Sequence, residues 1–158
     1  MFTRAGHADI QLPVRELDDE QGAAIVYQRL GSWFRIAVPG GWAWIKREGA
    51  TDFVSYPEVL RGKVSYFTEG WDRRLWREPA SAALVPFGSG WKALTRRNIA
   101  VELLGIRRLA NETWLRVRLT ELDDFGEEVQ QGRLKPVVGW IPAYRLSGET
   151  SLWYYARD

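Results

Sequence analysis

One aromatic pattern occurs twice in this chain, and it constrains the fold more than any other feature of the sequence. The segment SWFRIAVPGGWAWI starts at residue 32, and the segments TWLRVRL and VVGWIPAYRL supply a looser copy nearer the C-terminus. In the alignment of the two copies, Trp33 falls on Trp114, Arg35 on Arg116 and Ile36 on Val117. After a hairpin, either Gly41-Trp42 or Ala43-Trp44-Ile45 falls on Gly139-Trp140-Ile141.

The alternation within each copy is that of a β-strand. Because successive side chains of a strand point to opposite faces, Trp33 and Arg35 are predicted on one face and Phe34 and Ile36 on the other. The repeat therefore predicts two homologous small β modules, with a boundary near residues 58–66.

Strand patterns recur along the whole chain, whereas no run of twelve or more residues carries a convincing amphipathic helical face. The short apolar or alternating runs are separated by Gly, Pro, Asn and Asp, which is typical of a barrel or a sandwich. In the first copy, PGG at 39–41 predicts a tight hairpin. Strands are predicted at 22–30, 32–39, 41–48, 62–69, 98–109, 113–122 and 137–146.

Composition excludes several classes of site. The chain has no Cys and a single His, His7, so a zinc ribbon, a disulfide framework and a cysteine nucleophile are all excluded, and no metal or cofactor is predicted. The 22 basic and 20 acidic residues nearly balance, which is not the charge of a nucleic-acid binder. No apolar stretch approaches the roughly 20 residues of a membrane span, so we expect no membrane insertion.

Candidates for catalysis are weak. The acidic pairs at 18–20 and 123–128 lie in polar segments without the apolar surroundings that would raise the pKa of a general acid, so we interpret them as solvated loop charges. No Ser lies in a Gly-x-Ser-x-Gly elbow, and PGG and GSG lack the Lys of a phosphate loop. We expect that the chain is not an enzyme and has no catalytic residue.

The order of these motifs resembles the bacterial SH3-like (SH3b) domain. Residues 113–119 and 139–146 are similar to the C-terminal half of that module, which has Gly-Trp-(Val/Ile) and then a short turn into a Tyr-Leu or similar close; the corresponding residues here read GWIPAYRL. RRLWREPASA at 73–82 resembles its Leu-x-Val-Arg-x-x-Pro motif, with Leu75, Arg77 and Pro79 in the matching places. The predicted fold is all-β, with two small SH3-like barrels in tandem: 1–60, the looser match, and 61–158, with a long loop and a C-terminal aromatic extension.

The resemblance implies a non-catalytic binding module that recognises cell-wall peptidoglycan or a peptide of the bacterial envelope. The alternative is a protein–protein scaffold in which the two barrels pack rigidly together. The expected partners are cell-wall peptide or glycan, or a protein peptide, and no nucleic acid. Localisation stays open, and a periplasmic or extracellular protein is expected if a leader precedes Met1. The ligand-binding residues that we predict are Trp76, Arg77, Trp91 and Tyr144.

The tryptophans of the repeat are assigned a different role from those of the loops. We expect Trp33, Trp42 or Trp44, Trp114 and Trp140 to close or half-cover the barrel core rather than to touch a ligand. For Trp71, Trp76, Trp91 and Trp153, binding and packing remain equal alternatives. The aromatic segment 147–158 is expected to pack within the chain, as an added strand or as an anchor, in preference to docking on a partner.

Overall fold

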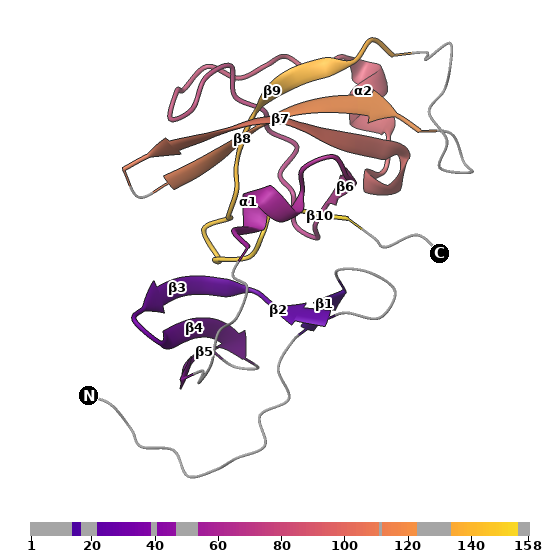
Figure 1. Cartoon of the computed structure of the whole chain (residues 1–158). Coiled ribbons are helices and arrows are strands. Elements are labelled where there is room, and N and C mark those ends of the chain that lie inside the picture. Colours follow the sequence, from indigo (N-terminus) through magenta and orange to yellow (C-terminus); the bar gives the residue numbers. More distant parts are fainter. Residues whose placement is uncertain are drawn as a thin grey trace. The chain divides into compact units, whose positions relative to one another are not determined.

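The chain forms two compact units, Met1–Phe53 with Tyr155–Asp158, and Val54–Tyr154. The computed structural model describes residues 14–16, 22–38, 41–46, 54–110, 112–122 and 134–154. Both units are mostly β, with antiparallel sheets of three and five strands and a separate two-stranded pair (Figure 1). The predicted domain limits, 1–60 and 61–158, stay a prediction.

The first unit contains a three-stranded antiparallel sheet in the order β3-β4-β5 and the pair β1-β2. In the β4–β5 hairpin Val38 lies opposite Gly41, so the two strands are joined by two residues, as the PGG sequence predicts. These two residues lie outside the described part. The strands of this unit are β1 (Val14–Glu16), β2 (Gly22–Ala24), β3 (Val26–Leu30), β4 (Trp33–Val38) and β5 (Gly41–Lys46).

The second unit is built on a five-stranded antiparallel sheet in the order β10-β6-β7-β8-β9. Figure 1 shows the long β7–β8 hairpin with β9 beside it. Its strands are β6 (Val64–Phe67), β7 (Ile99–Leu109), β8 (Glu112–Glu121), β9 (Val137–Pro142) and β10 (Leu152–Trp153). Its helices are short: α1 (Tyr56–Val59), α2 (Ser89–Ala93) and the 3₁₀ turn η1 (Arg96–Asn98).

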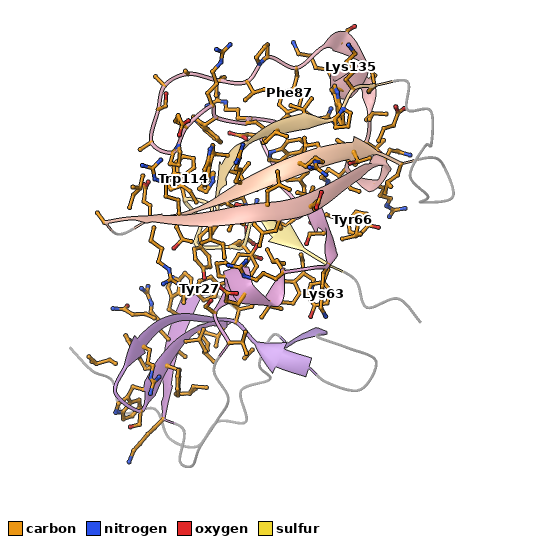
Figure 2. All side chains as sticks on the ribbon, turned by 45° about the horizontal axis from the view of Figure 1, so that its top comes forward. Tyr27, Lys63, Tyr66, Phe87, Trp114 and Lys135 are labelled. Atoms are coloured by element: carbon orange, nitrogen blue, oxygen red, sulfur yellow. The ribbon has the colours of Figure 1, made fainter. Side chains whose placement is uncertain are left out.

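Each of the seven predicted strand segments contains a strand. β8 illustrates why, because Leu115, Val117 and Leu119 point to one face and are fully buried, whereas Arg116 and Arg118 between them are exposed. Figure 2 shows side chains on both sides of β7 and β8. Burying an aliphatic side chain stabilises a fold by about 1.5–3 kcal/mol, so this alternation fixes which face of β8 becomes core.

Backbone hydrogen bonds link the chain after β9 to the chain before β10. Tyr144 bridges to Thr150, and the Ser151 N–H donates to the Ala143 carbonyl at 2.9 Å. β10 then pairs with β6, as Leu152 opposite Phe67. Pairing therefore runs from β6 through β7, β8 and β9 and returns to β6 through residues 150–153.

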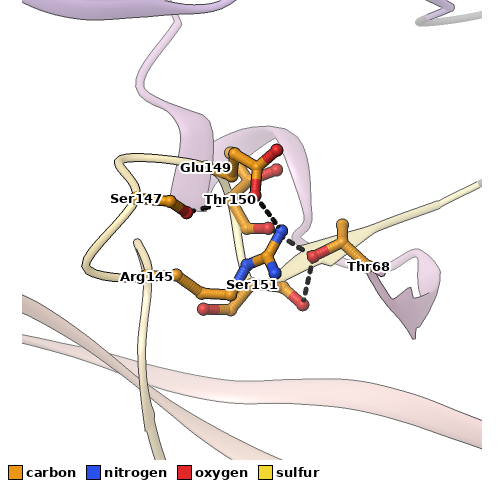
Figure 3. Close-up of polar contacts among 6 residues, drawn as sticks. All are labelled: Thr68, Arg145, Ser147, Glu149, Thr150 and Ser151. Atoms are coloured by element: carbon orange, nitrogen blue, oxygen red, sulfur yellow. Dashed lines mark hydrogen bonds and ion pairs between the residues drawn. The ribbon is translucent and has the colours of Figure 1, made fainter. Parts of the chain in front are cut away.

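A polar network fixes the segment before β10 (Figure 3). The Thr68 hydroxyl donates to the carbonyls of Thr150 and Ser151, at 2.5 and 3.2 Å. Arg145 pairs with Glu149, whose carboxylate also accepts a hydrogen bond from the Ser147 hydroxyl at 3.1 Å. These contacts hold the turn that leads into the last strand.

The C-terminal aromatic residues pack within the second unit, as expected from the sequence. Trp153 and Tyr154 are both buried, and the ring of Trp153 stacks on Tyr56, with centroids 6.1 Å apart. The Tyr56 hydroxyl donates to the Leu152 carbonyl at 2.7 Å and accepts from the Leu152 N–H at 3.0 Å. Leu152 and Trp153 thus form an added strand tied to α1, and Tyr155 lies outside the described residues.

Candidate functional site

Three exposed tryptophans lie on one face of the β3-β4-β5 sheet. Strand register places Arg35 opposite Trp44 and Trp33 opposite Lys46, so these side chains share a face, together with Trp42. We call Trp33, Arg35, Trp42 and Trp44 the tryptophan face. Relative exposure is 44% for Trp33, 42% for Trp42 and 36% for Trp44. The expectation that these tryptophans close a core is not met on this sheet, because the fully buried Ile36 lies on the opposite side, whereas their partial exposure is compatible with the expected half-covering role.

Two neighbours organise Trp42. The Arg35 guanidinium lies 4.4 Å from the centroid of the Trp42 ring, a cation–π contact that holds the positive charge against the sheet. The Tyr27 ring meets Trp42 edge to face, with centroids 4.9 Å apart. Tyr27, labelled in Figure 2, is the residue that the β3–β4 register skips between Val26 and Gln28. A β-bulge at this point lets Tyr27 turn toward the tryptophan face.

The second unit repeats this arrangement in the same register. Arg116 of β8 lies opposite Trp140 of β9, just as Arg35 lies opposite Trp44. This selects Ala43-Trp44-Ile45 as the match for Gly139-Trp140-Ile141.

The irregularities of the two sheets also coincide. In the β7–β8 pair the skipped residue is Leu104, which directly precedes Gly105, the residue opposite Arg116. In the β3–β4 pair the skipped residue is Tyr27, which directly precedes Gln28, the residue opposite Arg35. The internal repeat is therefore visible in strand pairing and bulge position as well as in sequence.

In the second unit a segment of the chain covers the equivalent face. Trp76 exchanges two backbone hydrogen bonds with Trp140, at 2.9 and 2.8 Å, and its ring meets Trp114 edge to face at a centroid distance of 5.6 Å. Trp76 also bridges to Leu84. Trp114 is consequently only 6% exposed, although its counterpart Trp33 is open.

The four predicted ligand-binding residues lie in three environments. Trp76 and its neighbour Arg77 belong to the segment beside β9, where Arg77 is exposed and its Nε donates to the Leu84 carbonyl at 3.3 Å. Trp91 lies on α2, is 5% exposed and donates its indole N–H to the Lys135 carbonyl at 3.3 Å. Tyr144 is half-buried, with its ring 5.4 Å from that of Tyr56. Ligand binding by these four residues stays a prediction.

Most ion pairs of the described part lie at the surface. Arg118 pairs with Glu102 at 2.9 Å, and Arg107 with Glu78 at 3.6 Å. A hydrogen bond and the charge of Glu58 raise the pKa of Arg61, but arginine is already protonated at neutral pH, so its charge is unchanged. Among the described residues, no three His, Cys, Asp or Glu side chains gather as a metal site would require. Nor is any helix in that part both long and apolar enough to cross a membrane.

Comparisons of the chain with family models, curated proteins and solved structures found no match. The candidate site therefore rests on its own geometry.

Sequence reasoning identified the residues of the tryptophan face but assigned them to the core. The alternation correctly placed Trp33 with Arg35, and the spacing of Trp42 and Trp44 puts both on one side of β5. The Trp-x-Arg pattern alone could not reveal this exposure, because Trp114 stands in the same pattern beside Arg116 and is buried.

Proposed function

We propose that this chain is a non-catalytic binding module that recognises a ligand of the bacterial cell envelope, peptidoglycan or an envelope peptide, on the tryptophan face. The observation that carries the proposal is the joint exposure of Trp33, Trp42 and Trp44 around Arg35. Contiguous exposed apolar groups on a small protein mark interaction sites, and Trp and Arg are the residues that contribute most at such sites.

The chemistry of the face matches such ligands. Flat indole rings offer broad apolar surfaces at a low entropic cost, because a tryptophan has only two side-chain torsions. Arg35 adds hydrogen-bond donors that suit a carboxylate. Peptidoglycan and peptides both combine apolar surface with carboxylates.

The fold that we propose for each unit is an SH3-like barrel. In the second unit the proposal is supported by the pairing that runs from β6 to β9 and returns through β10. In the first unit it is supported by the shared register and bulge of β3-β4-β5. A tandem of such barrels, one with a covered face and one with an open face, gives the open unit the binding role.

Sedimentation with purified peptidoglycan, together with fluorescence titration of envelope peptides, tests this proposal. We expect the full chain to bind at least one of these ligands, and the double variant Trp42→Ala/Trp44→Ala to lose most of that binding. The matched control is Val138→Ala/Leu146→Ala, which removes exposed apolar side chains from the second unit. Equal binding by the wild type and the tryptophan variant would show that the face is not the site. Binding of neither ligand class would overturn the proposal.

A further inference from the structure

The second unit demonstrates how its sheet edge accepts an additional strand. Beside β9, Trp76 pairs with Trp140 through both of its backbone groups and lays its ring on Trp114. Leu75, next to it, is fully buried. The edge of β9 and the adjoining tryptophan thus form one acceptor for an extended segment with an aromatic side chain.

Among the described residues, the first unit has the same acceptor without a strand on it. β5 is one of the two edge strands of the β3-β4-β5 sheet within the described residues. In a two-residue hairpin the pair next to the turn, here Val38 and Gly41, is hydrogen-bonded, and bonded pairs then alternate with non-bonded ones. Arg35 and Trp44 form a non-bonded pair by this count. The N–H and C=O of Trp44 therefore point away from β4, as those of Trp140 point to Trp76.

The exposed surface of β5 is unusual for an edge strand. Edge strands are commonly protected by charges, prolines or covering segments, because their unpaired backbone groups invite pairing. Trp42 and Trp44 instead expose apolar rings along this edge, and Trp33 lies beside them on β4. Such an edge is suited to a strand from another molecule, with main-chain hydrogen bonds for affinity and alternate side chains for specificity.

We infer that β5 binds an extended protein peptide as an additional antiparallel strand, with a large aromatic side chain of the peptide resting on Trp33. This inference rests on the proposed function and selects a peptide over a glycan as the ligand, because a glycan cannot supply the alternating N–H and C=O groups of a strand.

Two differences between the units define the peptide. Gly139 of β9 leaves room for Leu75, whose Cβ would lie 2.9 Å from an added Cβ, whereas β5 has Ala43 in that place. Because the close approach is to the Cβ atom itself, the residue before the aromatic one should be glycine. In the second unit Arg107 lies opposite Trp114 and forms an ion pair with Glu78 of the covering segment. In the first unit the residue opposite Trp33 is the exposed Leu30, so the peptide needs no carboxylate at the position of Glu78.

The test uses a labelled peptide with the sequence of residues 72–80 and the change Leu75→Gly, titrated into the full chain by fluorescence anisotropy. We expect saturable binding of this peptide. The peptide with the native sequence, which keeps Leu75, should bind more weakly. Methylation of the amide nitrogen at the Trp76 position should weaken binding about tenfold, because it removes one strand hydrogen bond and crowds the edge. Trp76→Ala in the peptide and Trp33→Ala in the protein should each weaken it by a similar or larger factor.

Amide NMR locates the bound peptide. Chemical shifts are expected to change at Trp44 and along β5, and the variant Val138→Ala should bind as the wild type does. Binding that is indifferent to amide methylation, or shift changes confined to Trp140, would overturn the inference. If the peptide does not bind but peptidoglycan sedimentation still requires Trp42 and Trp44, strand addition is wrong and the proposed function stands. If neither ligand requires them, both fail.

Discussion

Trp33 and Trp114 occupy the same position in two sheets of matching register, yet 44% of Trp33 is exposed and only 6% of Trp114. The difference arises outside the repeat, because Trp76 covers Trp114 from a segment beside β9. One repeated side chain therefore serves packing in one unit and remains available in the other.

Replacement of these two tryptophans by alanine should have unequal effects on stability. Trp114→Ala removes a buried ring and its contact with Trp76, so we expect the free energy of unfolding to fall by about 3–5 kcal/mol. Trp33→Ala removes a ring that is 44% exposed and should therefore cost less, about 1–2 kcal/mol. Urea unfolding followed by circular dichroism measures both. Equal losses would mean that Trp33 is packed as tightly as its counterpart.

The strands could be predicted because their side chains obey local rules. In β8 the alternation of Leu115, Arg116 and Val117 indicates which face is buried. The two-residue link between Val38 and Gly41 is predicted by the glycines of a tight hairpin. Local patterns of this kind aligned Trp33 with Trp114 and Arg35 with Arg116, but the choice between Trp42 and Trp44 as the match for Trp140 required the strand pairing.

The exposure of the tryptophans could not be predicted in the same way. Whether such a tryptophan is exposed depends on a covering segment, which in the case of Trp114 contains Trp76 and lies far away in sequence. The Trp-x-Arg pattern does not encode whether such a segment is present. Trp91 shows the converse, since a loop tryptophan expected as a candidate ligand contact is buried on α2 with its N–H bonded to Lys135. Long-range packing decided both cases.

Gly139→Ala tests the close packing of the covering segment. A Cβ at this position would lie 2.9 Å from Leu75 Cβ, 3.1 Å from Val85 Cγ2 and 3.2 Å from the Trp76 carbonyl oxygen. Two of these contacts are with the backbone or with atoms next to it, so the segment must shift, at a cost of about 1–3 kcal/mol. Thermal unfolding measures the loss. The reciprocal control, Ala43→Gly, should cost only about 0.5–1 kcal/mol from strand entropy. A Gly139→Ala protein as stable as the wild type would contradict the packing described for Leu75.

Tyr56→Phe tests the attachment of the last strand to α1. The substitution keeps the ring that stacks on Trp153 but leaves the Leu152 N–H and carbonyl without their hydroxyl partner in a buried site. We expect a loss of about 1–3 kcal/mol and faster hydrogen exchange of the Leu152 amide. If that amide exchanges at the wild-type rate, the hydroxyl does not hold β10.

The turns of the two repeated hairpins differ in a way that a reciprocal exchange can test. Gly31 and Ala110 each directly follow the first strand of a two-residue hairpin and both have left-handed backbones, with φ of 60° and 44°. An L side chain in this region costs about 1–2 kcal/mol, and no atom lies within 4 Å of a Cβ built at Gly31. Gly31→Ala should therefore destabilise the first unit by about 1 kcal/mol through backbone strain alone.

Ala110→Gly should stabilise the second unit by up to about 1 kcal/mol, since the relief of strain exceeds the entropy that glycine adds to the unfolded chain. Urea midpoints that move in opposite directions for the two variants are the expected result, and a shift of both in the same direction would contradict the equivalence of the turns.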